Sequence, residues 1–464
     1  RDTDGAFETL SRAFGIDPSR EATVQKLEDL VAACTYWSVY VDVLEEAIGR
    51  VREPDLQGNL QFKVAKIHEE KLGDAARAEA AFRRFLAMKI EDRTMVMASA
   101  VALEKIYAQG EKYVDLIAML QLQVEHSEDA RVRYDLLKRI AEIQETMLGK
   151  NEDAIATNLR ILEVEPDDVG GILALRRLYE AAQKWEDLIA ILKRMIGLSE
   201  NPGEKKSLTY EAASFYAEKL GNPEEAIFTY QLIGEEFGEE AAALNALVAL
   251  YEKIEDHVEL VATLDRLIKL SGKESETLEL LLRSGAVERD RIGDLPAAVD
   301  RFHRVLDIDA EDAAAMGALE ELLHRDTVRL KVARILEPHY ERAQSFEKLL
   351  GVFDIEIAEE ADPEAKARLQ RRAAEIAEIG LGDLAKAFGY FSDALRSKLD
   401  AAEQASAIID DLERITRDSN DHKRLVDFYT QIAPDILNGE LQLRIFMTVA
   451  ETCHKQLGAL ATAK

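Results

Sequence analysis

Residues 208–238, LTYEAASFYAEKLGNPEEAIFTYQLIGEEFG, contain the pattern on which the fold depends. Ala213 stands eight residues before Gly221, while Ala226 and Tyr230 follow that glycine at +5 and +9, with another apolar residue at +12. Offsets of four and three place the side chains after the glycine on one face of a helix. Gly221 suits the end of a preceding helix, because glycine adopts the left-handed conformation without a steric penalty. The stretch therefore predicts two helices joined by a glycine turn.

The same pattern recurs along the whole chain. Its turn glycines are spaced by 76, 72, 72, 89 and 76 residues and are Gly73, Gly149, Gly221, Gly293, Gly382 and Gly458. A second signature lies 36 residues before each glycine. A residue with a ring stands there, and apolar residues follow it at +3, +4 and +7. These ring-bearing residues are Trp37, Tyr113, Trp185, His257, Phe346 and His422. Each unit of about 72 residues therefore contains four helices. No alternation typical of a strand is present, so we expect an all-α fold.

The composition agrees with a folded, helical and acidic protein. Of 464 residues, 47% are hydrophobic, and 89 acidic residues against 59 basic ones give a net charge of −30. This apolar content excludes disordered and collagen-like chains. The charge would repel a nucleic-acid backbone unless a local basic patch overrides it, so we expect no nucleic-acid partner. No apolar run approaches the roughly 20 residues that span a bilayer, so we expect no membrane span.

Two observations bear on the compartment and on the ends of the chain. Cys34 and Cys453 are 419 residues apart, which excludes a disulfide framework and a zinc site. The compartment stays open, with the cytoplasm favoured and a bacterial periplasm as the alternative.

The chain begins at Arg1 without a methionine and ends at Lys464, inside a repeat. We therefore expect a fragment of a longer array.

The repeats resemble the tetratricopeptide repeat (TPR) family. The family's Ala-x3-Phe/Tyr pattern in the second helix of each pair is matched by Ala226 and Tyr230, by Ala298 and Phe302, and by Ala387 and Phe391, and its following proline by Pro166. The tyrosine of the family's first helix is matched by Tyr216, whereas the equivalent positions elsewhere hold His68, Gln144, Glu288, Ala377 and Cys453. The glycine turn is also one residue longer than the family standard. The resemblance implies a right-handed α-solenoid of antiparallel helix pairs, about 12 repeats in six units.

One unit is 17 residues too long, which indicates an irregularity in the array. The excess predicts an additional helix over Asp312–Arg325, followed by the usual one over Val328–Ala343. Pro338 lies inside the second of these and should kink it, because proline removes a backbone hydrogen bond. An odd number of helices should bend or divide the solenoid there. The predicted domains are a stack over 1–310, an irregular unit over 311–345 and a second stack over 346–464.

No motif in the chain indicates catalysis. The eight histidines include no pair at i and i+4, and there is no glycine-rich phosphate loop or nucleophile elbow. His257 and His422 occupy the ring-bearing position of the repeat and are expected to be structural. We therefore expect no catalytic, cofactor-binding or metal-binding residues, and no enzyme.

The resemblance implies that the first helix of each pair lines a concave groove. Three acidic residues follow the small residue of that helix and are candidate groove residues: Glu142, Glu375 and Glu451. Arg368, Arg371 and Arg372 form a basic cluster on another stretch of first helix. This cluster is a second candidate, with a salt-bridged surface as the alternative interpretation.

The sequence favours a non-enzymatic protein–protein interaction scaffold within a multiprotein complex. Its acidic charge favours partners with basic or apolar segments. The alternative is a regulatory or substrate-recruiting arm of an enzyme whose catalytic domain lies outside this fragment. A nucleic-acid-binding repeat is a third hypothesis, which the net charge of −30 opposes. The sequence does not indicate an oligomeric state.

Overall fold

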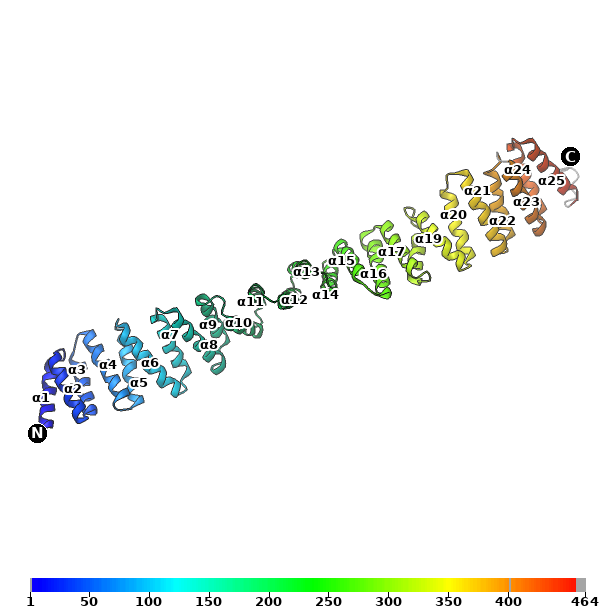
Figure 1. The fold of residues 1–464 in the computed structure, drawn as a ribbon. Helices are drawn as coiled ribbons and strands as arrows, with labels where there is room; N and C mark the ends of the chain where they lie inside the picture. Colours follow the sequence, from blue (N-terminus) through cyan, green and yellow to red (C-terminus); the bar gives the residue numbers. More distant parts are fainter. Residues whose placement is uncertain (1, 400–401, 456–464) are drawn as a thin grey trace. The chain divides into compact units, whose positions relative to one another are not determined.

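The computed structural model of the chain describes residues 2–399 and 402–455. Within these ranges the chain forms 25 α-helices and no β-strand. It divides into two compact units, Arg1–Thr229 and Tyr230–Lys464, with the boundary inside helix α13. Within each unit, consecutive helices pack against one another in chain order (Figure 1). The expected all-α solenoid is confirmed.

The first unit contains twelve complete helices among its described residues. Their bounds are α1 Thr3–Ile16, α2 Glu21–Cys34, α3 Trp37–Arg50, α4 Pro54–Glu70, α5 Ala75–Ala87, α6 Arg93–Gln109, α7 Tyr113–His126, α8 Ala130–Glu142 with the π-helical turn η1 Ile143–Met147, α9 Asn151–Val164, α10 Val169–Ala181, α11 Trp185–Leu198 and α12 Pro202–Glu218. Helix α13, Pro223–Phe237, crosses the boundary between the units.

The second unit continues the series. Its helices are α14 Ala241–Lys253, α15 His257–Leu270, α16 Glu274–Val287 with η2 Glu288–Ile292, α17 Leu295–Ile308, α18 Ala313–Leu322, α19 Arg329–Arg342, α20 Phe346–Glu359, α21 Pro363–Glu375 with η3 Ile376–Gly380, α22 Leu384–Arg396, α23 Ala402–Ser419, α24 His422–Ile432 with the short 3₁₀ turn η4 Ala433–Asp435, and α25 Gly439–Lys455.

The glycine turns have the predicted conformation. The five described turn glycines all have positive φ, between 60° and 82°, and are Gly73, Gly149, Gly221, Gly293 and Gly382. At each turn the residue after the glycine donates its N–H to the carbonyl of the residue five positions before the glycine. Asp294, for example, donates to Glu288 at 2.9 Å. This bond closes the helix in a Schellman-type cap. The sixth turn, at Gly458, lies outside the described residues.

The extra residue of this turn is absorbed by the end of the first helix. In three units the last turn is π-helical and forms η1, η2 and η3. The other two units contain the same widened i to i−5 bond, from Leu72 to Ile67 and from Leu220 to Phe215, both at 3.0 Å. A π-turn accommodates one additional residue without breaking the helix. The helix pair therefore keeps its packing despite the longer turn.

A second kind of turn connects the other helix pair of each unit. It contains a left-handed residue that is not glycine, two positions before the ring-bearing residue, and these residues are Thr35, Glu111, Gln183, Glu255, Gln344 and Asn420. The ring-bearing residue is the first residue of its helix in all six cases: α3, α7, α11, α15, α20 and α24. In four of these pairs the preceding helix carries a buried tyrosine four residues after the leucine that stands ten positions before the ring-bearing residue: Tyr107, Tyr179, Tyr251 and Tyr340. Each unit thus alternates two types of helix pair.

The core consists of the side chains that the repeat pattern selected. The leucine ten residues before each ring-bearing residue is at most 1% exposed in all six cases, and so are Phe82, Ile161 and Phe391 of the stripe that follows the turn glycines. Helix α1 is an exception. The spacing of Ala6, Leu10 and Ala13 matches the one that follows each turn glycine and predicts Ala6 and Ala13 on the buried face. This register is wrong by one residue, because α1 buries Phe7 and Phe14.

The irregular unit contains the additional helix that its length predicts. Helices α18 and α19 stand where other units have one first helix, and α19 continues past Pro338 to Arg342. One hydrophobic core extends from Leu281 in α16 to Ile445 in α25 and includes buried residues of both helices. The insertion is therefore packed into the second unit.

Candidate interaction surface

The three candidate carboxylates lie exposed at or near the ends of first helices. Glu142 ends α8, Glu375 ends α21, and Glu451 lies in the last turn but one of α25. Among the described residues, Glu142 and Glu375 have no ion-pair partner, whereas Glu451 contacts Lys455 at 3.1 Å. Two of the three are thus available to a partner.

Ion pairs join successive first helices to one another. Arg139 of α8 contacts Glu104 of α6 at 2.7 Å, and Arg176 of α10 contacts Glu211 of α12 at 2.9 Å. The partners are separated by 35 residues, which is the length of one helix pair. Further pairs of this kind are Lys63–Glu28, Arg283–Glu252, Arg372–Glu337 and Arg414–Glu378. Each is worth little in stability because it is partly exposed, but together they place neighbouring first helices side by side.

The three arginines of the basic cluster are all paired. Arg368 contacts Glu364 within its own helix at 3.4 Å. Arg371 reaches Asp411 of α23 at 3.3 Å, and Arg372 contacts Glu337 and Glu341 of α19 at 2.6 and 2.9 Å. This arrangement agrees with the salt-bridged surface weighed as the alternative. A partner that used these arginines would have to displace three sets of carboxylates.

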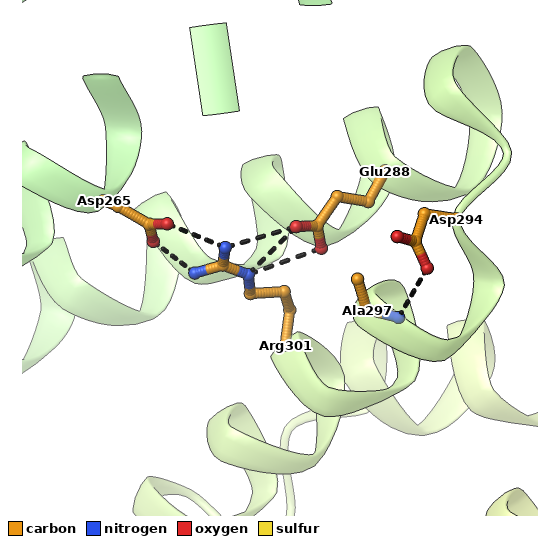
Figure 2. Close-up of polar contacts among 5 residues, drawn as sticks. All are labelled: Asp265, Glu288, Asp294, Ala297 and Arg301. Atoms are coloured by element: carbon orange, nitrogen blue, oxygen red, sulfur yellow. Dashed lines mark hydrogen bonds and ion pairs between the residues drawn. The ribbon is translucent and has the colours of Figure 1, made fainter. Parts of the chain in front are cut away.

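A buried ion pair lies inside the repeat at the position of the family's tyrosine (Figure 2). Arg301 of α17 contacts the carboxylate of Glu288 in η2 at 3.2 Å and also pairs with Asp265 of α15. Burial raises the pKa of Glu288, whereas the hydrogen bonds to Asp265 and Glu288 raise that of Arg301. Asp294 next to it accepts from the N–H of Ala297 at 3.1 Å and caps α17. These contacts join α15, η2 and α17 to one another.

The structure supplies no metal-ligand cluster in residues 2–399 and 402–455, since no three histidine, cysteine, aspartate or glutamate side chains converge there. His257 and His422, expected to be structural, are half-buried at the first positions of α15 and α24. Within the same ranges no helix has the length and apolarity required to cross a membrane.

The comparisons with known proteins identify the repeat. The family model described as tetratricopeptide repeat matches residues 172–206, which cover most of α10, all of α11 and the start of α12. The helix pair α10 and α11 therefore matches the tetratricopeptide type. The match falls on the type of TPR-like pair that contains a buried tyrosine, here Tyr179, and a non-glycine turn at Gln183.

Solved structures with low overall similarity to this chain include a tetratricopeptide repeat protein. The Naa15/Naa10 structure bound to HypK-THB is 14% identical, with a TM-score of 0.28, and covers 100% of this chain and 68% of that one. A tetratricopeptide repeat protein from Parabacteroides merdae ATCC 43184 is 14% identical, with a TM-score of 0.23, and covers 57% of this chain and 97% of that one. No curated protein matches the chain in sequence.

One regular feature of the sequence marks the second type of helix pair and was not used to predict it. The tyrosine four residues after the leucine that stands ten positions before the ring-bearing residue was present at Tyr107, Tyr179, Tyr251 and Tyr340, and its regular spacing could have identified the second type of pair. The non-glycine turns gave no comparable signal, because residues as different as Thr35 and Glu111 adopt the same left-handed conformation.

Proposed function

We propose that this chain is a non-catalytic protein-interaction scaffold and a component of a multiprotein complex. The observation that carries the proposal is the series of ion pairs between successive first helices, such as Arg139–Glu104 and Arg176–Glu211. It supports a continuous surface within each unit, along which an extended partner segment can contact several repeats. Stacked repeats bind partners over such surfaces because no single helix pair presents enough area.

The charge of the first-helix surface favours a partner with a basic or an apolar segment. Glu142 and Glu375 are exposed and have no ion-pair partner among the described residues, and the chain has a net charge of −30. Long-range attraction would accelerate the encounter with a basic segment, and a few desolvated side chains would supply the affinity. Nucleic acid does not suit this surface, because its phosphates would be repelled.

Capture of partners from a lysate of the source organism, with identification by mass spectrometry, tests this proposal. Glu142→Lys and Glu375→Lys alter the first-helix surface. Glu125→Lys in α7 and Glu347→Lys in α20 are matched controls, because both glutamates are exposed on second helices and unpaired among the described residues. We expect the first pair of changes to remove proteins that the control pair retains. Equal capture by both variants would contradict the proposed surface.

A further inference from the structure

The irregular unit contains a groove beside its inserted helix. It lies between α17 and α19, has a volume of about 880 Å³, and is open to solvent along α19. Its apolar floor includes Leu306 of α17 together with Ile335 and Pro338 of α19. Leu306 and Ile335 are themselves at most 8% exposed, so the floor is continuous with the core of the second unit.

The inserted helix accounts for this groove. In a regular unit the second helix packs against the next first helix, as α9 does against α10. Here, of the two helices that follow it, α17 packs more against α18 and contacts α19 only sparsely. His339 of α19 fastens the far end of the groove, since its Nδ1 lies 3.2 Å from the carbonyl oxygen of Ala310, just after α17. The space between α17 and α19 is consequently bounded on both sides but not filled.

The rim of the groove is basic although the protein is acidic. Lys331, Arg334 and Arg342 line it, against the single carboxylate of Asp307. Lys331 contacts Asp300 at 2.6 Å, whereas Asp307 lies 3.7 Å from the imidazole of His303 on the same rim.

Two of these rim cations are available for a ligand. Arg334 and Arg342 are exposed, and no carboxylate oxygen of the described residues lies within 4 Å of either. Arg334 has an electrostatic influence on Glu356, whose pKa is raised by burial and by Glu337 and is lowered in part by Arg334 and Arg372. The contrast with Arg368, Arg371 and Arg372, which are all paired, separates this rim from the basic cluster of α21.

We propose that the groove between α17 and α19 binds an acidic segment of a partner protein. An apolar side chain of that segment lies on Leu306, Ile335 and Pro338, while its carboxylates pair with Arg334 and Arg342. Arginine suits this role because its planar guanidinium binds carboxylates in a bidentate manner. The inference rests on the proposed function, since it adds a second docking site, of opposite charge, to the scaffold.

The test is a selection of random twelve-residue peptides displayed on phage, carried out on the full chain and on the Arg334→Glu/Arg342→Glu variant. Arg304→Glu/Arg325→Glu is the matched control, because both arginines are exposed and unpaired among the described residues, and neither lines the groove. Selected peptides are then synthesised with a fluorescent label and measured by fluorescence anisotropy. Circular dichroism verifies that each variant is folded.

We expect peptides that combine Asp or Glu with a large apolar residue, whose affinity falls at least tenfold in the groove variant and less than twofold in the control. Absence of any peptide that depends on Arg334 and Arg342, or selection of neutral or basic peptides, would overturn the inference. Binding of a labelled poly-uridine 20-mer that depends on the same arginines would overturn the peptide assignment. Peptides that bind all variants equally would leave the proposed function intact and refute the groove, so the two failures are distinguishable.

Discussion

The guanidinium of Arg301 lies 3.2 Å from the buried carboxylate of Glu288. Arg301 is the eighth residue after the turn glycine Gly293, and Glu288 is the fifth residue before that glycine. The same two positions hold Thr157 and Gln144 in another unit, where the threonine hydroxyl donates to the amide oxygen at 2.7 Å. In these two units a polar residue in the first helix is thus matched by a polar residue in the second. Neither pair contains the tyrosine typical of the family.

Removal of one member of the buried pair should destabilise the second unit. Arg301→Met leaves the carboxylate of Glu288 buried without its cation, and we expect a loss of about 3 kcal/mol. The double variant Glu288→Gln/Arg301→Thr reproduces the pair of Gln144 and Thr157 and should recover most of that loss. Urea unfolding followed by circular dichroism measures both. If the double variant is as unstable as the single one, the two positions do not act as a pair.

His68 should make the stability of the first unit sensitive to acid. It is 4% exposed, its Nδ1 has no hydrogen-bond partner, and Ala81 stands where Thr157 and Arg301 stand in the other units. Burial lowers the pKa of His68, with opposing contributions from Asp74 and Glu45. The unfolded chain therefore binds a proton near pH 6.5, before the folded chain does, and stability is lost as the pH falls through that value.

The measurement compares the wild type with His68→Gln at pH 7.5 and pH 5.5. We expect the free energy of unfolding of the wild type to fall by on the order of 1 kcal/mol more than that of the variant. The other seven histidines are common to both proteins and cancel in the comparison. An identical pH dependence would show that His68 is protonated equally in the folded and the unfolded chain.

Both kinds of turn should be more stable with glycine than with another residue at the left-handed position. Gly149 has a φ of 63°, so Gly149→Ala should cost about 1 kcal/mol. Thr35 is a β-branched residue with a φ of 55°, and Thr35→Gly should stabilise the first unit by up to about 1 kcal/mol because it relieves strain. Thermal and urea unfolding measure both changes. A destabilised Thr35→Gly variant would mean that the entropy of the unfolded chain outweighs the strain.

The domain organisation predicted from the sequence can be tested by an experimental structure. We expect helices before residue 310 and after residue 345 to form two regular stacks, with an altered rotation between neighbouring pairs across 311–345. The continuous core through α18 and α19 requires this change to occur by repacking rather than by a linker. Uniform superposition of adjacent helix pairs across residues 300–360 would contradict the prediction.

Much of the fold follows from the spacing of particular residues. Gly73 and its equivalents predicted the left-handed turns, because glycine adopts this conformation without a steric penalty. The apolar residues that follow Trp37 and its equivalents predicted helices there. The groove between α17 and α19 could not be predicted. It depends on how an inserted helix displaces its neighbour, and this is decided by tertiary packing rather than by periodicity. The pairing of Arg371 with Asp411 likewise depends on the stacking of helices 40 residues apart.

The central claim is that the first-helix surface binds a protein partner with the help of its negative charge. The most direct measurement is the kinetics of a captured partner against salt, for the wild type, for Glu142→Lys/Glu375→Lys and for the control Glu125→Lys/Glu347→Lys. Salt screens charges beyond roughly 8 Å at physiological strength, so it should slow association more than it changes dissociation. We expect the first-helix variant to associate several-fold more slowly and the control to match the wild type. Equal association rates for all three proteins, or a rate that does not change with salt, would contradict the account.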